Sequence, residues 1–275
     1  MESLKYTEIK ITINAKAPFF IGSQIRGAFG VALKRVVCIN PSFECKECFA
    51  QNNCLYFDFY ENRNIYHNYR LDFELGKSYY DFSLILFEDS STKLPFVLSA
   101  FLKMLKEIGL GKERKTFEDF RIFINEDEIN LANLKLPLNY IKEFQIENFC
   151  PDITINFVTP LRIKKRNQFA RAEELELSDI LNSIYQRNLK LLGLKNSKIP
   201  FKTEAKVLKK ELTFLELKRY SNRQKTKMNF GGLVGEITLK DLNRESFKLL
   251  KLGELIGVGK QTSFGLGKIK IEENR

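Results

Sequence analysis

The spacing of apolar residues along the chain predicts its strands and helices. Ile9, Ile11 and Ile13 alternate with polar residues, which is the period of a strand with one buried face. From 23 to 36 the apolar residues recur at helical spacing, so we expect a helix there. The same two periods predict the remaining elements: a strand at 80–87, a helix at 101–108, strands at 121–124 and 153–158, a helix at 177–192, a hairpin with arms 206–220 and 227–239, a helix at 243–255 and a strand at 268–271.

Two short motifs occur twice, in the same order. The tetrapeptide Ile-Thr-Ile-Asn stands at 11–14 and again at 153–156, a shift of 142 residues. The motif Ile-Gly-x-Gly-Lys stands at 108–112 and again at 256–260, a shift of 148 residues. Nearly equal shifts indicate a tandem duplication, because solenoid repeats have periods of only about 20–50 residues. The alternative is a pair of unrelated glycine turns and a common strand tetrapeptide.

The elements and the duplication together predict an α+β fold with two domains, 1–148 and 149–275. Each domain is close to β-α-β-β-α-β, the ferredoxin-like or RRM-like arrangement. In such a unit the glycine motif links the second helix to the last strand. The first domain carries an insertion at about 36–60, which holds most of the cysteines.

The second glycine motif is the longer of the two and is rich in polar and basic residues. Glycine permits positive φ and close approach of the backbone to a ligand. Lysines and exposed N–H groups suit phosphate oxygens. We therefore expect this loop to hold a polyphosphate, through Gly257, Gly259, Lys260, Gln261, Ser263, Phe264, Gly265, Gly267 and Lys268.

The formal net charge is +11, and its distribution is uneven. Residues 1–150 hold 19 Lys and Arg against 20 Asp and Glu, whereas residues 151–275 hold 26 against 14. Such asymmetry predicts a polyanion partner for the second domain, the alternative being a scattered surplus of solvated lysines. A cluster of basic residues begins at Arg162. The residues that we expect to contact the polyanion are Lys164, Lys165, Arg166, Arg171, Arg223 and Lys225. No apolar run approaches the ~18 residues of a membrane span, so we expect a soluble, cytoplasmic protein.

Four of the five cysteines fall within 17 residues: Cys38, Cys45, Cys48 and Cys54. Four thiolates can close a tetrahedral, structural Zn²⁺ site, although this spacing matches no zinc-ribbon signature. Reduced buried cysteines and disulfides are the alternatives, and a disulfide set would leave Cys150 over. Catalytic zinc is not expected, because no histidine lies nearby in the sequence.

His67 is the only histidine, and it lies among polar and aromatic residues. Histidine is the side chain whose unperturbed pKa lies nearest neutrality, so His67 is a candidate general base, the alternative being a structural or merely exposed role. Several chemistries find no support. The glycine motifs match neither the P-loop nor the dinucleotide fingerprint, and no G-x-S-x-G nucleophile elbow occurs.

Several segments also resemble a known family. Gly-Gly-Leu-Val-Gly-Glu-Ile at 231–237, followed by a helix and the loop 257–267, is similar to a C-terminal signature of the RAMP superfamily of CRISPR-associated proteins. Segments 25–30, 54–56 and 108–112 are similar to the N-terminal half of a branch that bears a cysteine cluster. On these motifs the chain resembles the endoribonucleases that cut the repeat RNA of precursor CRISPR RNA.

The resemblance implies an RNA-cleaving hydrolase in antiviral defence, with CRISPR repeat RNA or crRNA as its partner and a CRISPR effector complex as a further one. It implies metal-independent attack of a 2′-hydroxyl on the adjacent phosphate, which leaves a 2′,3′-cyclic phosphate. The family often places a catalytic histidine in or just after the first helix, and here Arg26, Lys34 and Arg35 occupy that helix instead. We expect His67 to act as the base with cationic help from Arg26 and Lys34; alternatively, the cations act alone.

Two other functions stay open at this point. One is a non-catalytic RAMP subunit that holds crRNA within an effector complex. The other is a zinc-stabilised RNA-binding protein unconnected with CRISPR. The oligomeric state and the form of RNA recognised do not follow from the sequence.

Overall fold

The computed structural model describes residues 3–62, 65–133, 135–146, 148–221 and 226–274, the side chains of 219–221 and 226–227 excepted. The chain divides into two compact units, Met1–Glu143 and Phe144–Arg275. The boundary predicted between 148 and 149 lies a few residues inside the second unit. Among the described residues, no helix is long and apolar enough to cross a membrane.

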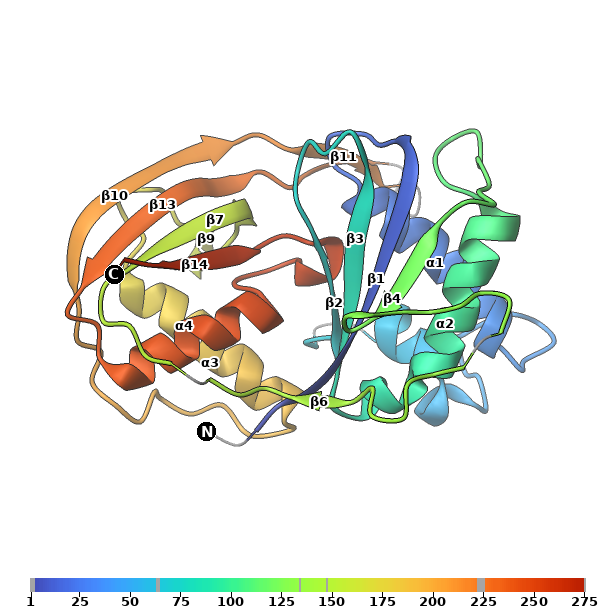
Figure 1. Ribbon diagram of the computed structural model, residues 1–275, viewed down its shortest axis with the longest axis horizontal. Coiled ribbons are helices and arrows are strands. Elements are labelled where there is room, and N and C mark those ends of the chain that lie inside the picture. The colour runs from blue at the N-terminus through green and yellow to red at the C-terminus, as the bar shows by residue number, and fades with distance from the viewer. Residues whose placement is uncertain (1–2, 63–64, 134, 147, 222–225, 275) are drawn as a thin grey trace. The chain divides into compact units, whose positions relative to one another are not determined.

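The first unit has one antiparallel sheet, with its helices packed together on one face (Figure 1). The strand order is β2-β3-β1-β4, extended by β5 beside β4, and β6 also pairs with β1. The order along the chain is β1 (Lys5–Lys16), α1 (Gly22–Val37), β2 (Tyr69–Phe73), β3 (Tyr79–Phe87), α2 (Leu94–Lys103), β4 (Arg121–Ile124), β5 (Asp127–Glu128) and β6 (Lys142–Glu143). Short helical turns lie between them: η1 (Gln51–Asn53), η2 (Phe57–Glu61), η3 (Glu88–Lys93) and η4 (Met104–Ile108).

The second unit repeats this topology in the strand order β10-β13-β7-β14 (Figure 1). Its main elements are β7 (Ile153–Leu161), α3 (Leu177–Leu191), β10 (Lys206–Leu215), β13 (Gly232–Lys240), α4 (Arg244–Ile256), the short turn η5 (Thr262–Phe264) and β14 (Ile269–Glu273). Two small hairpins are added: β8 (Lys164–Lys165) with β9 (Gln168–Phe169), and β11 (Lys218–Ser221) with β12 (Thr226–Asn229). The prediction of an α+β fold with two ferredoxin-like units is therefore confirmed.

The repeated tetrapeptide occupies the central strand of both sheets. Ile11 of β1 lies opposite Phe82 and Ile122, and Ile155 of β7 lies opposite Ile237 and Ile271. All of these side chains face the cores, which explains why apolar residues alternate there.

Two parts of the fold differ from the sequence prediction. Strand β2 was not expected, because Tyr69, Arg70 and Leu71 are all buried and no alternation marks the strand. The long hairpin is broken between β10 and β11 and between β12 and β13, so its outer part forms a separate two-stranded sheet. Phe230, at the second break, donates its backbone N–H to the Leu217 carbonyl and joins the two arms there.

Candidate functional site

The π-helical turn η2 in the first unit holds two of the three predicted catalytic residues by adjacent carbonyl groups. Nδ1 of His67 lies 2.9 Å from the Asp58 carbonyl oxygen. Arg26 on α1 donates from Nη2 to the carbonyl of Phe59, at 3.3 Å. A carbonyl oxygen only accepts, so Nδ1 of His67 carries the proton and the lone pair of the neutral ring is on Nε2.

Arg26 is further held by Tyr60 of the same turn. Its guanidinium lies 4.4 Å from the centre of the Tyr60 ring, and the Tyr60 hydroxyl donates to the Arg26 carbonyl at 2.7 Å. Burial, assisted by Tyr69, raises the pKa of Tyr60 well above its ordinary value, although Arg26 opposes the shift. Tyr60 is therefore a neutral phenol at physiological pH.

Glycine at position 30 makes room for this contact. A Cβ on Gly30 would lie 2.6 Å from Cε1 of the Tyr60 ring. The face of α1 with Arg26, Gly30 and Lys34, which sequence periodicity left polar, is thus covered by the cysteine-bearing insertion.

Lys34 contacts Tyr56, the aromatic residue that stacks on Tyr60. Its ammonium is 4.9 Å from the centre of the Tyr56 ring, and Tyr56 stacks on Tyr60 at 5.2 Å. On the other side, His67 lies 5.7 Å from Tyr69, which stacks on Phe59 at 4.3 Å. Arg26 and Lys34 of α1 and the distant His67 therefore all lie against η2 or the residue that precedes it.

The cysteines of the insertion are free thiols in this structure. Burial raises the pKa of the Cys45 thiol and outweighs the opposite influence of the nearby positive charge of Lys34. Cys38 instead donates to the carbonyl of Asn40 at 3.7 Å. Within the described part of the chain, no group of three or more His, Cys, Asp or Glu side chains lies close enough to hold a metal ion. The thiols thus do not form a tetrahedral site as they stand, and zinc binding stays a prediction.

The glycine-rich loop of the second unit is closed by its own backbone. Val258 donates to the carbonyl of Gly267 at 2.8 Å, and Gly267 donates to that of Pro160 at 3.1 Å. Gly259 donates to the Ser183 hydroxyl and Lys268 to the Thr159 hydroxyl, both at 2.8 Å. These N–H groups are not open to a ligand, contrary to the expectation of an exposed backbone cradle.

The side chains of the loop differ in exposure. Lys260 is exposed and Lys268 is half-buried, while Ser263 is buried and Phe264 packs edge-on against Phe230 at 4.9 Å. The remaining candidates have structural roles: positive φ at Gly257, Gly259, Gln261, Gly265 and Gly267 shapes the loop. Polyanion binding here would depend on the lysine side chains.

The small hairpin β8–β9 carries the exposed cations Lys164 and Arg166. Lys165 is instead paired with Asp179 at 2.9 Å and with Glu176 at 3.6 Å. Arg171 is exposed, and its backbone N–H donates to the Glu174 carboxylate at 2.9 Å. Arg223 and Lys225 lie outside the described residues.

Arg162 joins the hairpin to the glycine-rich loop, a role that the sequence did not reveal. It is buried, with its guanidinium 4.0 Å from the centre of the Phe169 ring and bonded to the Gly231 carbonyl. Its own carbonyl accepts the backbone N–H of Lys260 at 2.9 Å. Burial lowers the pKa of this guanidinium. The strand predicted at 153–158 ended four residues before Arg162, so the place of this residue at the end of β7 was not visible in the sequence.

Comparison with known families relates the second unit to one of them. Residues 155–269 match the family described as the CRISPR-associated endoribonuclease Cas6. This segment is similar to Cas6. Residues 4–132 match a second family, described as an N-terminal domain. The resemblance to the RAMP repeat-RNA endoribonucleases is therefore confirmed, and the segment 155–269 contains both Arg162 and the glycine-rich loop.

Three further comparisons cover nearly the whole chain. An uncharacterized protein of Archaeoglobus fulgidus is 24% identical, and the alignment covers 98% of each chain. A structure described as a Cas6 product complex has a TM-score of 0.52 at 17% identity, covering 98% of this chain and all of that one. A RAMP protein described as binding different RNA substrates has a TM-score of 0.50 at 12% identity, with 98% and 100% covered. At these identities the solved structures show a likeness of fold and nothing more.

Proposed function

We propose that this protein is a CRISPR repeat-RNA endoribonuclease that cuts precursor crRNA. The observation that carries the proposal is the Cas6 match over 155–269, the segment with the largest excess of positive charge. Proteins of the same fold are described as Cas6 complexes with a product and with a substrate mimic, which agrees with RNA as the ligand.

The chemistry that we assign requires no metal ion. The 2′-oxygen attacks the adjacent phosphorus, the bond from phosphorus to the 5′-oxygen breaks, and the leaving 5′-oxygen takes a proton from solvent water. The products are a 2′,3′-cyclic phosphate and a 5′-hydroxyl. Nε2 of His67 accepts the 2′-hydroxyl proton, because the bond to Asp58 keeps the proton of the neutral ring on Nδ1. Arg26 and Lys34 offer positive charge to the phosphorane, which carries an extra negative charge.

RNA binding is assigned to the exposed cations of the second unit. The β8–β9 hairpin carries Lys164 and Arg166, and the glycine-rich loop carries Lys260. Arg162 contacts both the hairpin and the loop. Phosphate contacts of this kind give affinity without sequence selectivity.

A second candidate function is a non-catalytic RAMP subunit that binds crRNA, either alone or within an effector complex. The observation that favours it is the environment of Arg26, whose guanidinium is already engaged with Tyr60 and the Phe59 carbonyl. Such a side chain has less freedom to follow a reacting phosphate than an exposed arginine.

Incubation of the purified protein with the repeat RNA of its own locus, in EDTA, separates these functions. The proposal expects cleavage at one position, a cyclic phosphate identified by mass spectrometry, and no cleavage when that nucleotide is 2′-deoxy. Tight binding without cleavage identifies the crRNA-binding subunit. Cleavage that requires added magnesium overturns the mechanism, and equal affinity for repeat and unrelated RNA overturns the assignment to CRISPR repeats.

A further inference from the structure

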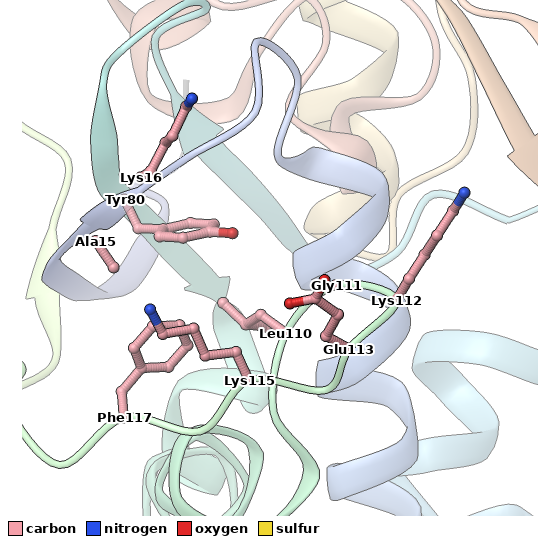
Figure 2. Close-up of a pocket in the computed structure, with 9 residues that line it drawn as sticks. All are labelled: Ala15, Lys16, Tyr80, Leu110, Gly111, Lys112, Glu113, Lys115 and Phe117. Atoms are coloured by element: carbon pink, nitrogen blue, oxygen red, sulfur yellow. The ribbon is translucent and has the colours of Figure 1, made fainter.

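A pocket of about 240 Å³ lies at the first glycine motif, within the first unit (Figure 2). It is formed where β1 ends, where β3 begins and where the turn from Leu110 to Lys115 passes over them. Tyr80, Leu110 and Phe117 make an apolar floor, and all three are largely buried. No residue of the pocket belongs to the catalytic cluster around η2.

The rim of the pocket is basic. Lys16, Lys112 and Lys115 line it and are exposed, against a single acidic residue, Glu113. In Figure 2 the Lys16 and Lys112 side chains extend outward on two different sides, while Lys115 lies beside Phe117. The ammonium of Lys115 is 5.9 Å from the centre of the Phe117 ring. This concentration of lysines stands out in a half of the chain where positive and negative residues otherwise balance.

The turn that carries Lys112 and Lys115 begins in the same way as the glycine-rich loop of the second unit. Gly109 ends its helix with φ 75° and ψ 169°, and Gly257 does so with φ 77° and ψ 163°. The second glycines also agree, with φ 81° at Gly111 and 78° at Gly259. An exposed lysine follows each, Lys112 and Lys260.

The two loops share one closing backbone bond and differ in length and in their other bonds. Leu110 donates its backbone N–H to the carbonyl of Lys115 at 2.8 Å, as Val258 does to that of Gly267. The longer loop of the second unit contains the additional turn η5, whereas the first loop is a short basic tip beside an open pocket. The matching glycine conformations and the exposed lysine after each second glycine favour the same kind of ligand, an anion, at both loops.

We propose that this pocket binds a nucleotide of the RNA chain, with one flanking phosphate at Lys112, the other at Lys115 and the base over the apolar floor. The inference rests on the proposed function for the identity of the RNA. An anion gains from lysines at the mouth of a concave, partly apolar site more than from scattered surface lysines, because the local dielectric is lower. At about 240 Å³ the pocket lies just below the ~300–1,000 Å³ of drug-sized ligand sites, a size that suits a single nucleotide base.

The test compares three variants by fluorescence anisotropy between 50 and 200 mM salt. Lys112→Ala with Lys115→Ala should weaken binding of uncleavable repeat RNA about tenfold. It should also reduce the slope of log K against log salt by about 1.4, which corresponds to two single-strand phosphate contacts. Glu113→Gln should strengthen binding, because it removes the acidic group. Lys93→Ala with Lys135→Ala, exposed lysines of the same unit outside the pocket, should bind as the wild type does.

An unrelated RNA of equal length and uridine monophosphate serve as further probes. Equal affinity of the Lys112/Lys115 variant and the wild type for both RNAs overturns the pocket. If the wild type does not distinguish the two RNAs but the variant weakens both, the pocket stands and the repeat-RNA function fails. Binding of the free nucleotide that depends on these lysines, with RNA affinity unchanged, overturns the assignment to an RNA chain.

Discussion

His67 donates from Nδ1 to a backbone carbonyl, and this one bond selects the tautomer in which Nε2 can accept a proton. Loss of a general base typically slows a reaction about 10²–10⁴-fold. We expect His67→Ala to slow single-turnover cleavage by that order and to leave RNA affinity nearly unchanged. His67→Gln is the matched control, because an amide can keep the bond to Asp58 but cannot act as a base.

Cleavage by His67→Gln at the wild-type rate would show that His67 only positions the turn η2. Cleavage by both variants at that rate would move the chemistry to Arg26 and Lys34. Single-turnover rates for Arg26→Ala and Lys34→Ala then decide whether the cations act alone, and unchanged rates there would remove the whole catalytic assignment.

Gly30 and Gly27 lie on the same helix, and we expect alanine at the two positions to change the unfolding free energy in opposite directions. A Cβ on Gly30 would meet the ring of Tyr60, whereas a Cβ on Gly27 would meet nothing within 4 Å. Gly30→Ala should therefore cost about 1–3 kcal/mol of unfolding free energy through overpacking. Gly27→Ala should gain about 0.5–1 kcal/mol, because alanine loses less backbone entropy in a helix.

Chemical denaturation measures both changes. If Tyr60 holds Arg26 in place for cleavage, Gly30→Ala also slows the reaction, while Gly27→Ala leaves the rate unchanged. Equal stability of the two variants would contradict the packing described here.

Part of this site could be predicted from the sequence. The helical period placed Arg26 and Lys34 on one face of α1, and the structure has them there. That Tyr56 and Tyr60 cover this face could not be predicted, because they come from a segment without periodicity and their position depends on tertiary packing. The tautomer of His67 likewise depends on a carbonyl nine residues away in the chain.

At the scale of elements, the glycine caps were predictable and strand β2 was not. Gly109 directly follows an amphipathic segment, and it ends that helix with positive φ. Strand β2 contains Arg70, which is 1% exposed and paired with Asp72, so a charged residue stands where a core position would be apolar. Only the folded environment makes that residue acceptable in a buried strand.

The insertion between α1 and β2 is where a metal would act. If the four cysteines bind zinc, the protein purified without chelator should contain about one zinc per chain by elemental analysis, and its removal should lower the melting temperature. Cys45→Ser should abolish the zinc content, whereas Cys150→Ser, which changes a buried cysteine of the other unit, should retain it.

Zinc takes no part in the chemistry of the proposed reaction. When zinc is removed, we therefore expect cleavage activity to fall only as far as the fraction of folded protein falls. Protein without zinc would contradict the metal site. Full cleavage by metal-free protein that keeps its structure would show that the insertion is stable with its thiols reduced.

At the scale of the whole molecule, two units share one topology and differ in charge. The first 150 residues are nearly balanced, and the remaining residues carry the excess of positive charge. The duplicated fold therefore does not by itself determine which half binds RNA, whereas the charge distribution was visible in the sequence. What the sequence could not show is that Lys165 is neutralised by ion pairs and that Arg162 is buried.

This distribution predicts that the second unit supplies most of the RNA affinity. Lys260→Ala with Lys268→Ala removes two cations of the glycine-rich loop and leaves its backbone bonds intact, because those use main-chain atoms and the hydroxyls of Ser183 and Thr159. Binding of repeat RNA should weaken, and the slope of log K against log salt should fall by about 1.4. The melting temperature should not change.

Two comparisons make this result specific. Lys195→Ala with Lys248→Ala removes the same charge from exposed positions of the same unit outside the loop, so an equal loss of affinity there would mean that only net charge matters. Gly267→Ala tests the backbone, because its Cβ would collide with the Val258 carbonyl oxygen at a φ of 71°. That variant should lose stability as well as RNA affinity, whereas the lysine pair loses affinity alone. Unchanged binding by the Lys260/Lys268 variant from low to moderate salt would contradict a role for this loop in holding RNA.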